Sequence, residues 1–526
     1  MSIRSAAWIV SVCVAGLAAC NRGPATEDAA QAAPTPTSIC EGLASLALPD
    51  AKITTASLVP RGGFVPPTST PPPPGVTAQP SFADVPAFCR VAATLAPTPD
   101  SEIKIEVWMP AEAWNGKLVG TGNGGFSGAI GYNVLAPLVT RGYAAAATNT
   151  GHDGGPADTA FAVGHPEKLA DFGWRAVHEM TVKAKAIVAA HYGTAASRSY
   201  WSGCSTGGRQ GLKEAQVFPE DYDAIAAGAP ANNWVPLVAY GALVQQTNVD
   251  ANAALPREKL VLLKEAAIKE CDARDGVTDR VINEPKTCAF DPTKLQCQAG
   301  DGADCLTARQ VESARKIYRG VVNPRTGTTL FSGPQPGSEP AWAGYQPGVF
   351  PIAANYWRDI VMKDPNWDLT TLDFDADLKR AYETETFGLA ATEPNLARFV
   401  AHGGKLLLWH GMTDGLIPTQ SSIDYYNDVI TANGADKVKD AVRLFLLPGV
   451  DHCRGGEGTY AFDDVAALDA WVEQSRAPDQ LTASRPLDGG AQRTRPLCPY
   501  PQVARYKGSG NSDDAASFEC AAAASR

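Results

Sequence analysis

Residues 198–208, RSYWSGCSTGG, decide the fold class of this 526-residue chain. RSYWSG is typical of a buried strand, and a helix is expected from about Gly208. Between them, residues 203–207 have the spacing G-x-S-x-G, which arises by chance in about one chain in six of this length. Its position between a strand and a helix makes the pattern specific, because a nucleophile elbow requires that sharp turn with its serine exposed at the tip.

Segments on both sides of this turn alternate between strand and helix patterns. Strands are expected at residues 103–109, 143–149, 405–411 and 443–449, with another that runs into a glycine-rich loop over residues 117–128. Helical spacing marks residues 173–192 and 462–474. This alternation predicts a parallel sheet with helices on both faces, the arrangement of an α/β-hydrolase fold.

Two later residues complete a candidate catalytic triad with Ser205. A serine hydroxyl needs a base to take its proton, and His452 and Asp414 each follow a buried strand, where α/β sheets place active sites. The chain order Ser205, Asp414, His452 is that of α/β-hydrolases. An isolated aspartate after a strand more often caps a turn. His410 is the alternative base, but it lies too close in sequence to Asp414 for that residue to orient it.

Cysteines adjoin both ends of this triad. Cys204 precedes Ser205, and Cys453 follows His452. A bond between them would fix the distance between serine and histidine. It would close a loop of about 250 residues, worth about 5 kcal/mol in the chain-entropy model. The alternative is two unrelated structural cysteines.

Composition and patterning divide the rest of the chain. Hydrophobic residues make up 44%, charged residues 19%, and the net charge is −11 without a long basic run. These values exclude a disordered chain and argue against a nucleic-acid partner. Residues 232–395 lack the alternation and hold four cysteines. We therefore predict an inserted domain there, with the hydrolase domain in residues 40–231 and 396–526.

The N-terminus predicts export. Arg4 precedes an apolar stretch at residues 6–19, too short to span a bilayer but typical of a signal peptide. Its end, LAAC, resembles the lipobox of bacterial lipoproteins, so we expect residues 1–19 to be removed and Cys20 to be lipidated. The expected location is the bacterial envelope, as an outer-membrane lipoprotein; the alternative is an ordinary signal peptide. Residues 20–39 are expected to form a flexible tether.

Export also bears on the remaining cysteines. Removal of residues 1–19 takes away Arg4 and Cys13 and changes the net charge to −12. Ten cysteines other than Cys20 then remain, and an even number in an oxidising compartment predicts five disulfides. The proline-rich residues 64–80 are expected to form a loop, since Cys40 and Cys89 flank it and could staple it.

The CS-D-HC arrangement of Cys204-Ser205, Asp414 and His452-Cys453 resembles the tannase/feruloyl esterase family. The family includes feruloyl esterases, tannases and mono(2-hydroxyethyl) terephthalate hydrolase. The resemblance covers nearly all of the mature chain. It includes WNG at 114–116, GCSTGGRQG at 203–211, WHGMTD at 409–414, LPGVDHC at 447–453 and RTRPLCPYPQVARYKGSG at 493–510.

The resemblance implies a carboxylic ester hydrolase acting on small esters of aromatic acids, with residues 232–395 as its lid. It implies that the backbone N–H groups of Gly125 and Thr206 form the oxyanion hole, where preorganised donors meet developing charge. The implied disulfides are Cys204–Cys453, Cys271–Cys288, Cys297–Cys305 and Cys498–Cys520, with Cys40–Cys89 by matching position.

Within the predicted lid, residues 272–281, DARDGVTDRV, carry three carboxylates around a glycine turn. Oxygen ligands of this kind suit Ca²⁺, although the spacing is not that of an EF-hand and fits a solvated acidic loop equally well. Similarity to the family's calcium loop implies a structural Ca²⁺. Its ligands would be the side chains of Asp272, Asp275 and Asp279 and the main-chain carbonyls of Val277 and Val281. No organic cofactor is expected.

The sequence leaves alternatives for the identity of the substrate. Thr206 fits the feruloyl esterase and tannase pattern, whereas the terephthalate-ester hydrolase carries glutamate there, so its activity is the alternative. The lid residues Trp342, Trp357 and Trp367 either stack on a substrate ring or fill the core. A different class of protein, a ligand-binding surface lipoprotein without catalysis, would have no need for an intact triad. An exported serine peptidase is a third possibility.

Overall fold

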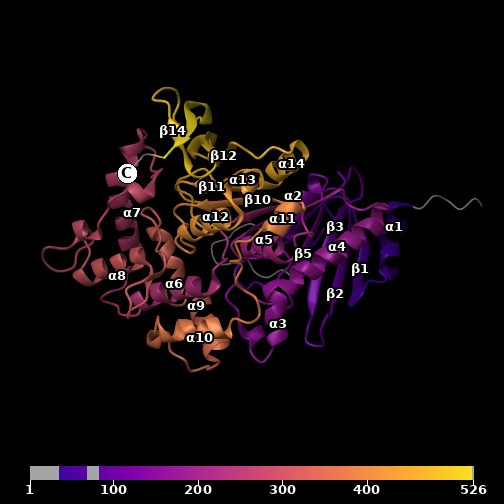
Figure 1. Ribbon diagram of the computed structural model, residues 1–526, viewed down its shortest axis with the longest axis horizontal. Coiled ribbons are helices and arrows are strands. Elements are labelled where there is room, and N and C mark those ends of the chain that lie inside the picture. Colours follow the sequence, from indigo (N-terminus) through magenta and orange to yellow (C-terminus); the bar gives the residue numbers. More distant parts are fainter. Residues whose placement is uncertain (1–34, 68–81, 524–526) are drawn as a thin grey trace, which may run out of the picture. The chain divides into compact units, whose positions relative to one another are not determined.

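The computed structural model describes residues 35–67 and 82–523 (Figure 1). The expected signal peptide, Cys20 and most of the tether lie outside the described residues. The tether prediction is wrong at its end, because Pro36–Gly42 forms helix α1. Proline is tolerated there, since the first turn of a helix has no partner for its N–H groups. Among the described residues, no helix is long and apolar enough to cross a membrane.

Nine strands form one mixed sheet in the order β1-β2-β3-β5-β4-β6-β7-β10-β11. The neighbours from β5 to β11 are parallel, but β1, β2, β3 and β5 pair antiparallel. The prediction of a parallel sheet is wrong for that half, because β1, β2 and β3 follow one another without crossover helices. The strands are Ala51–Val59, Phe88–Leu95, Ile103–Pro110, Lys117–Thr121, Ala144–Thr148, Arg198–Cys204, Ala224–Gly228, Lys405–Gly411 and Val442–Leu447, numbered β1 to β7, β10 and β11.

Helices cover both faces of this sheet, as predicted. Successive strand residues point to opposite faces. In β10, Leu406 and Leu408 belong to a core shared with α4, α5 and α12, while Leu407 and Trp409 belong to a core shared with α2 and α14. These helices are α2 Tyr132–Thr140, α4 Ala176–Tyr192, α5 Thr206–Val217, α12 Gln420–Asn433 and α14 Asp464–Gln474. The shorter helices are α3 Pro166–Ala170, α11 Ala397–Ala401 and α13 Ala435–Val438.

Two boundaries differ from the sequence prediction, and the strands β1, β2 and β7 of the main sheet were not predicted. The expected helix over 173–192 begins as a π-helical segment, Asp171–Arg175, and continues as α4. Helix α5 begins directly after Ser205 instead of near Gly208. Strand β7 was not predicted, because its sequence AIAAG is mostly alanine and glycine, which strands disfavour. It is fully buried between β6 and β10, so packing decides its conformation.

The segment expected to be the lid leaves the sheet after β7 and returns before β10. Its elements are α6 Trp234–Thr247, α7 Arg257–Cys271, α8 Ala308–Arg319, β8 Val321–Val322, β9 Thr329–Phe331, α9 Ile352–Asn355 and α10 Ala376–Thr384 (Figure 1). They enclose a separate apolar core that also takes in Phe126 and Phe172 from the first part of the chain. Trp342 and Trp357 are buried in this core. They therefore act as core residues, not as a platform for a substrate ring.

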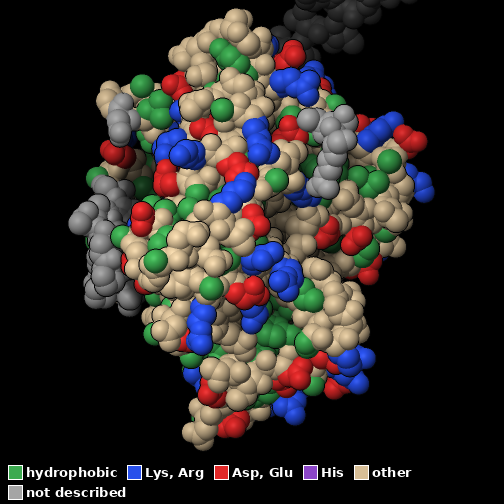
Figure 2. All heavy atoms as spheres, turned by 90° about the vertical axis from the view of Figure 1, so that its left-hand side faces the viewer, with side chains coloured by type: hydrophobic (Ala, Val, Ile, Leu, Met, Phe, Trp, Pro, Cys, Tyr) green, Lys and Arg blue, Asp and Glu red, His purple; other side chains and the backbone are tan. Residues whose placement is uncertain are grey.

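The C-terminal part consists of two hairpins, β12 Leu481–Pro486 with β13 Gln492–Leu497, and β14 Gln502–Tyr506 with β15 Phe518–Ala522. All five implied disulfides are present: Cys40–Cys89, Cys204–Cys453, Cys271–Cys288, Cys297–Cys305 and Cys498–Cys520. Figure 2 shows acidic and basic side chains interspersed over one face of the molecule. Ion pairs at the surface of residues 232–395 include Arg280–Glu265 and Arg309–Asp250.

Candidate active site

Ser205 lies in a strained turn between β6 and α5. Its φ of 65° and ψ of −124° place a residue with a side chain in a region that normally favours glycine, at a cost of about 1–3 kcal/mol. The backbone packs tightly around it, because a Cβ on Gly203 would lie 2.7 Å from Gly207 backbone atoms. The Ser205 amide donates to the Gly228 carbonyl over 2.9 Å. The turn thus has the backbone geometry that the sequence predicts for a nucleophile elbow.

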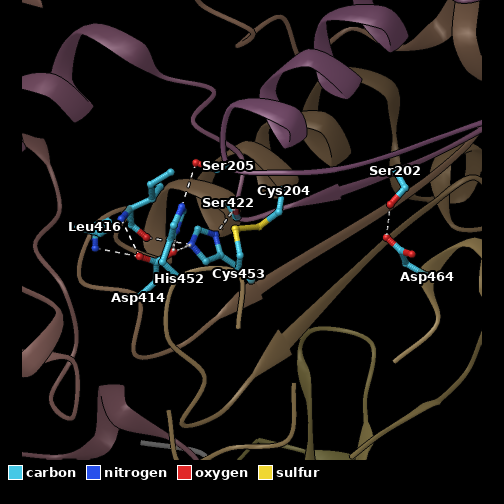
Figure 3. Close-up of a disulfide and its surroundings, with 11 residues drawn as sticks. Ser202, Cys204, Ser205, Asp414, Leu416, Ser422, His452, Cys453 and Asp464 are labelled. Atoms are coloured by element: carbon cyan, nitrogen blue, oxygen red, sulfur yellow. Dashed lines mark hydrogen bonds and ion pairs between the residues drawn. A yellow bond between two sulfur atoms is a disulfide. The ribbon is translucent and has the colours of Figure 1, made fainter. Parts of the chain in front are cut away.

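The structure brings the three predicted triad residues together (Figure 3). His452 Nε2 lies 2.9 Å from Ser205 Oγ, and His452 Nδ1 lies 2.7 Å from Asp414 Oδ2. A carboxylate only accepts, so Nδ1 carries the proton and Nε2 is free to accept the serine proton. The three side chains therefore form one chain of hydrogen bonds in the direction that general-base catalysis requires.

Asp414 is fully buried yet held as an anion. Its Oδ1 accepts the amides of Leu416 and Ile417 over 2.9 and 2.8 Å. Burial raises the pKa of Asp414, but the nearby His452 and hydrogen bonds from His410 and His452 outweigh it and leave that pKa well below its ordinary value. For His452 the same interaction with Asp414 shifts the pKa upward instead of downward. Burial lowers its pKa, and the charge and hydrogen bond of Asp414 raise it above 6.5.

His410, the alternative base, contacts the acid but not the serine. Its Nε2 lies 3.2 Å from Asp414 Oδ2, so its closeness in sequence to Asp414 does not prevent a contact between the two side chains. The same nitrogen lies 2.9 Å from the Ile417 carbonyl, which only accepts, so Nε2 carries a proton. His410 Nδ1 pairs with Ser422 Oγ over 2.7 Å. His410 is a buried neighbour of the acid, while His452 contacts the serine.

A disulfide joins the two loops that carry serine and histidine. Cys204 bonds to Cys453 across a sequence separation of 249 residues (Figure 3). Cys453 has a φ of 62°, so the histidine loop also turns sharply at this point. The loop has a further tie to the acid loop, because Thr413 Oγ1 donates to Asp451 Oδ1 over 3.0 Å.

The predicted oxyanion donors adjoin the elbow. Gly125 has a φ of 55°, and a Cβ there would lie 2.2 Å from the Pro156 carbonyl oxygen, so only glycine fits. The Thr206 side chain donates to the Gly125 carbonyl over 2.8 Å. In the part of the chain that the structure describes, neither the Gly125 nor the Thr206 amide has an acceptor. Both are available to a substrate oxygen.

Two tyrosines of residues 232–395 hold the loop that carries Asp414. Tyr240 donates to the Gly415 carbonyl over 3.0 Å, and Tyr345 donates to the Leu416 carbonyl over 3.1 Å. Sequence reasoning missed both residues, because nothing in the local sequence distinguishes them from other core aromatics. The inserted segment therefore supports the loop that carries Asp414.

The acidic loop at residues 272–281 is folded around its own carboxylates. Asp272 accepts the amides of Asp279 and Arg280 over 3.2 and 3.0 Å. Burial, followed by the charges of Asp279 and Asp272, raises the pKa of Asp275 to about 6. Arg495 binds Asp279 Oδ2 over 2.5 Å. In the part of the chain that the structure describes, these three carboxylates do not bring their ligand atoms within 4.8 Å of one another, and Asp279 already has a cationic partner in Arg495.

A second group of possible metal ligands lies outside this site. His178, Glu214 and Asp221 each place one ligand atom within 4.8 Å of the others. However, His178 Nδ1 lies 2.7 Å from Asp221 Oδ2, which is a hydrogen-bond distance and shorter than the about 3.3 Å between two ligands of a tetrahedral zinc. Burial, followed by the Asp221 charge, raises the pKa of Glu214 well above its ordinary value, which disfavours the charged form that a metal ligand needs. The hydrogen bond between His178 and Asp221 therefore joins α4 to the turn after α5, and we do not interpret the group as a metal site.

A nucleophile elbow on a mixed sheet, with an acid and a histidine after later parallel strands, defines the α/β-hydrolase class. The sequence matches the family described as Tannase and feruloyl esterase over residues 89–521. The chain belongs to this family and is a carboxylic ester hydrolase of the feruloyl esterase and tannase type.

Proteins of similar sequence match this protein over nearly the whole chain. An uncharacterized esterase of Xanthomonas campestris pv. campestris is 35% identical, with 91% of each chain covered. The mono(2-hydroxyethyl) terephthalate hydrolase of Piscinibacter sakaiensis is 34% identical over 85% of this chain and 86% of that protein. The crystal structure of feruloyl esterase B from Aspergillus oryzae superposes with a TM-score of 0.84 at 30% identity, covering 93% of this chain and all of that one.

Proposed function

We propose that the protein is a serine esterase that cleaves small esters of aromatic acids through an acyl-enzyme. The observation that carries the proposal is the unbroken chain of hydrogen bonds from Ser205 through His452 to Asp414, at 2.9 and 2.7 Å. The amides of Gly125 and Thr206, which have no acceptor among the described residues, lie in the loop and helix that adjoin the serine.

The mechanism has two steps. Ser205 Oγ attacks the ester carbonyl carbon while His452 Nε2 takes its proton, and Asp414 stabilises the resulting imidazolium. The Gly125 and Thr206 amides donate to the tetrahedral oxyanion. His452 then protonates the leaving alcohol oxygen, and water, activated by the same histidine, hydrolyses the acyl-serine. The fully buried Asp414 stays ionised throughout, because its pKa lies well below its ordinary value.

Aromatic acids are the proposed acyl groups. Relatives that share about a third of the sequence are named feruloyl esterases, and one is named mono(2-hydroxyethyl) terephthalate hydrolase. Thr206 fits the feruloyl esterase and tannase pattern, so we favour ferulate-like or gallate-like esters. Terephthalate monoester hydrolysis is the second candidate, supported by the 34% identity to that enzyme.

Initial rates on a panel of esters test this proposal. The panel is methyl ferulate, methyl gallate, mono(2-hydroxyethyl) terephthalate and a short p-nitrophenyl ester. We expect Ser205→Ala to lose at least three orders of magnitude in rate while staying folded. The matched control is Ser202→Ala on strand β6, directly before the turn that carries Ser205; its hydroxyl donates to Asp464 and not to His452 (Figure 3). An active Ser205→Ala variant would overturn the nucleophile assignment.

The same panel separates the alternatives. Hydrolysis of the p-nitrophenyl ester alone would remove the aromatic-acid assignment but keep the esterase. Failure to hydrolyse any ester, together with failure of a fluorophosphonate to label Ser205, would favour a ligand-binding protein. Faster hydrolysis of amides than of esters would favour a peptidase.

We further propose that the protein is exported and anchored through a lipid on Cys20. Five disulfides within the described residues support an oxidising compartment. The expected result is a lipid-modified N-terminus by mass spectrometry and release of the protein by Cys20→Ser. An unmodified Cys20 in the membrane fraction would contradict the anchor.

A structural Ca²⁺ in the loop at residues 272–281 is part of the proposal. Asp272, Asp275 and the carbonyls of Val277 and Val281 would hold it, with Asp279 shared with Arg495. The cation would offset repulsion among the carboxylates and tie the loop together. Calcium titration by calorimetry tests the site, and absence of binding at millimolar Ca²⁺ would reject it.

A further inference from the structure

Two side chains donate hydrogen bonds to successive carbonyls of the glycine-rich loop that carries Gly125. Thr206 Oγ1 donates to the Gly125 carbonyl over 2.8 Å. His152 Nε2 lies 2.7 Å from the Phe126 carbonyl, which only accepts, so this nitrogen carries the proton and donates. The amide between these carbonyls, on Phe126, donates to the Pro156 carbonyl over 2.9 Å. The peptide after Gly125 is thus fixed at both of its polar ends.

His152 is built into this contact. Its side chain is buried, and its ring stacks on Phe161 with centroids 3.6 Å apart. A Cβ on Gly128 would lie 2.6 Å from His152 Cδ2, so the loop packs directly on the ring. Burial lowers the pKa of His152, which keeps the ring neutral with its proton on Nε2. Within residues 35–67 and 82–523, the buried Nδ1 has no hydrogen-bond partner, so the Phe126 carbonyl receives the hydrogen bond that the ring donates.

We propose that the Thr206 hydroxyl and the His152 imidazole are positioning groups that hold the Gly125 amide where the oxyanion forms. The proposal rests on the proposed function of Ser205 and its oxyanion hole. A glycine-rich loop has no intrinsic rigidity, because glycine populates many backbone conformations. Oxyanion stabilisation nevertheless requires donors that are fixed before the reaction. The two side-chain hydrogen bonds supply this fixation.

This arrangement gives Thr206 two tasks. Its amide is one candidate oxyanion donor, and its hydroxyl holds the residue that supplies the other. Because the residue directly follows the nucleophile, any movement of the elbow carries both donors with it. With a residue at position 206 that lacks a hydroxyl, the peptide after Gly125 would be held only by the hydrogen bonds that Phe126 makes with Pro156 and His152.

The test compares Thr206→Val, Thr206→Ser and Thr247→Val in the full-length enzyme. Valine has the shape of threonine without the hydroxyl, and serine restores the hydroxyl. Thr247 is the matched control, because it is also buried and donates to a main-chain carbonyl, that of Val244, within α6. We expect Thr206→Val to lower kcat about tenfold, less than the hundredfold or more that follows loss of a whole oxyanion donor. KM should change less than twofold, and Thr206→Ser should recover most of the rate.

A second pair of variants examines His152. His152→Gln keeps an N–H donor and His152→Leu does not, so we expect the leucine variant alone to lose about tenfold in kcat. The rate of Ser205 labelling by a fluorophosphonate should fall in proportion, because that reaction also builds a negative oxygen at the site. A purely structural role would lower the melting temperature without this loss.

Two results would overturn the inference. One is an unchanged kcat in both Thr206→Val and His152→Leu. The other is a loss in these variants that matches their loss of melting temperature and is equalled by Thr247→Val. Activity in Ser205→Ala would instead reject the proposed function, so the two failures can be told apart.

Discussion

Replacing both Cys204 and Cys453 by alanine tests whether their disulfide positions the histidine as well as stabilising the fold. The bond closes a loop of 249 residues, for which the chain-entropy model gives about 5 kcal/mol. The unfolding entropy of a chain this size makes 1 kcal/mol worth about 1 °C, so the melting temperature should fall by about 5 °C. Cys453 directly follows His452, and a displacement of about 1 Å can cost a hundredfold in rate. We expect kcat to fall between tenfold and a hundredfold.

The matched control is the pair Cys498 and Cys520. This disulfide spans only 22 residues in the C-terminal part, so its removal should cost about 3 kcal/mol and about 3 °C. It adjoins none of the triad residues, so kcat should not change. Thermal unfolding followed by circular dichroism gives the melting temperatures. Rates are measured at 25 °C, well below either transition, so that unfolding does not contribute.

The comparison separates positioning from stability. If the variant without Cys204 and Cys453 keeps kcat within twofold while its melting temperature falls, the disulfide only stabilises the fold. The prediction that it positions His452 is then refuted. If both double variants lose rate equally, general loosening explains the loss. Only a loss of rate confined to the first variant supports positioning.

Three further predictions concern the pKa of His452, the carboxylate loop at residues 272–281 and the hydrogen bond from Tyr345. The rate constant kcat/KM should rise with pH through a pKa above 6.5, because neutral His452 is the proposed base and Asp414 raises its pKa. In Asp414→Asn the rise of kcat/KM should occur at lower pH, and the maximum value of kcat/KM should be much smaller. Chelation of Ca²⁺ should lower the melting temperature of the wild type by several degrees but not that of Asp275→Asn, measured by scanning fluorimetry; equal responses would contradict the assigned loop. Tyr345→Phe should lower the free energy of unfolding in urea by about 1 kcal/mol and lower kcat a few-fold, because the carbonyl of Leu416 loses its donor. If neither value changes, this hydrogen bond contributes nothing to stability or to catalysis.

The parts of the site that share a local sequence pattern could be predicted. Ser205 stands out because strand, turn and helix follow one another within a few residues. Asp414 and His452 stand out because the carboxyl ends of parallel strands meet at one edge of a sheet. The same logic failed for β7, Ala224–Gly228, because alanine and glycine carry no strand preference and only burial between two strands fixes their conformation.

Contacts between distant segments could not be predicted. The hydrogen bond from Thr206 to Gly125 joins residues 81 positions apart. No periodicity or composition indicates which carbonyl a threonine hydroxyl will meet. The antiparallel half of the sheet was missed for a related reason, since β1 and β2 pair through a register that depends on the packed sheet and not on either sequence alone.

The hydrogen bonds from the inserted segment to the loop of Asp414 show that the support of the candidate triad is divided between two parts of the chain. Asp414 lies in the hydrolase part, but the two carbonyls that follow it accept hydrogen bonds from Tyr240 and Tyr345, which lie in the inserted segment. Both tyrosines are buried in the core of that segment, so their hydroxyls can hold the acid loop only when that core is folded. The inserted segment is therefore a condition for the geometry of the triad. If the inserted segment is exchanged between relatives, the new segment would have to bring both hydroxyls with it, because otherwise Asp414 would be displaced and any change in activity would be confounded by that displacement.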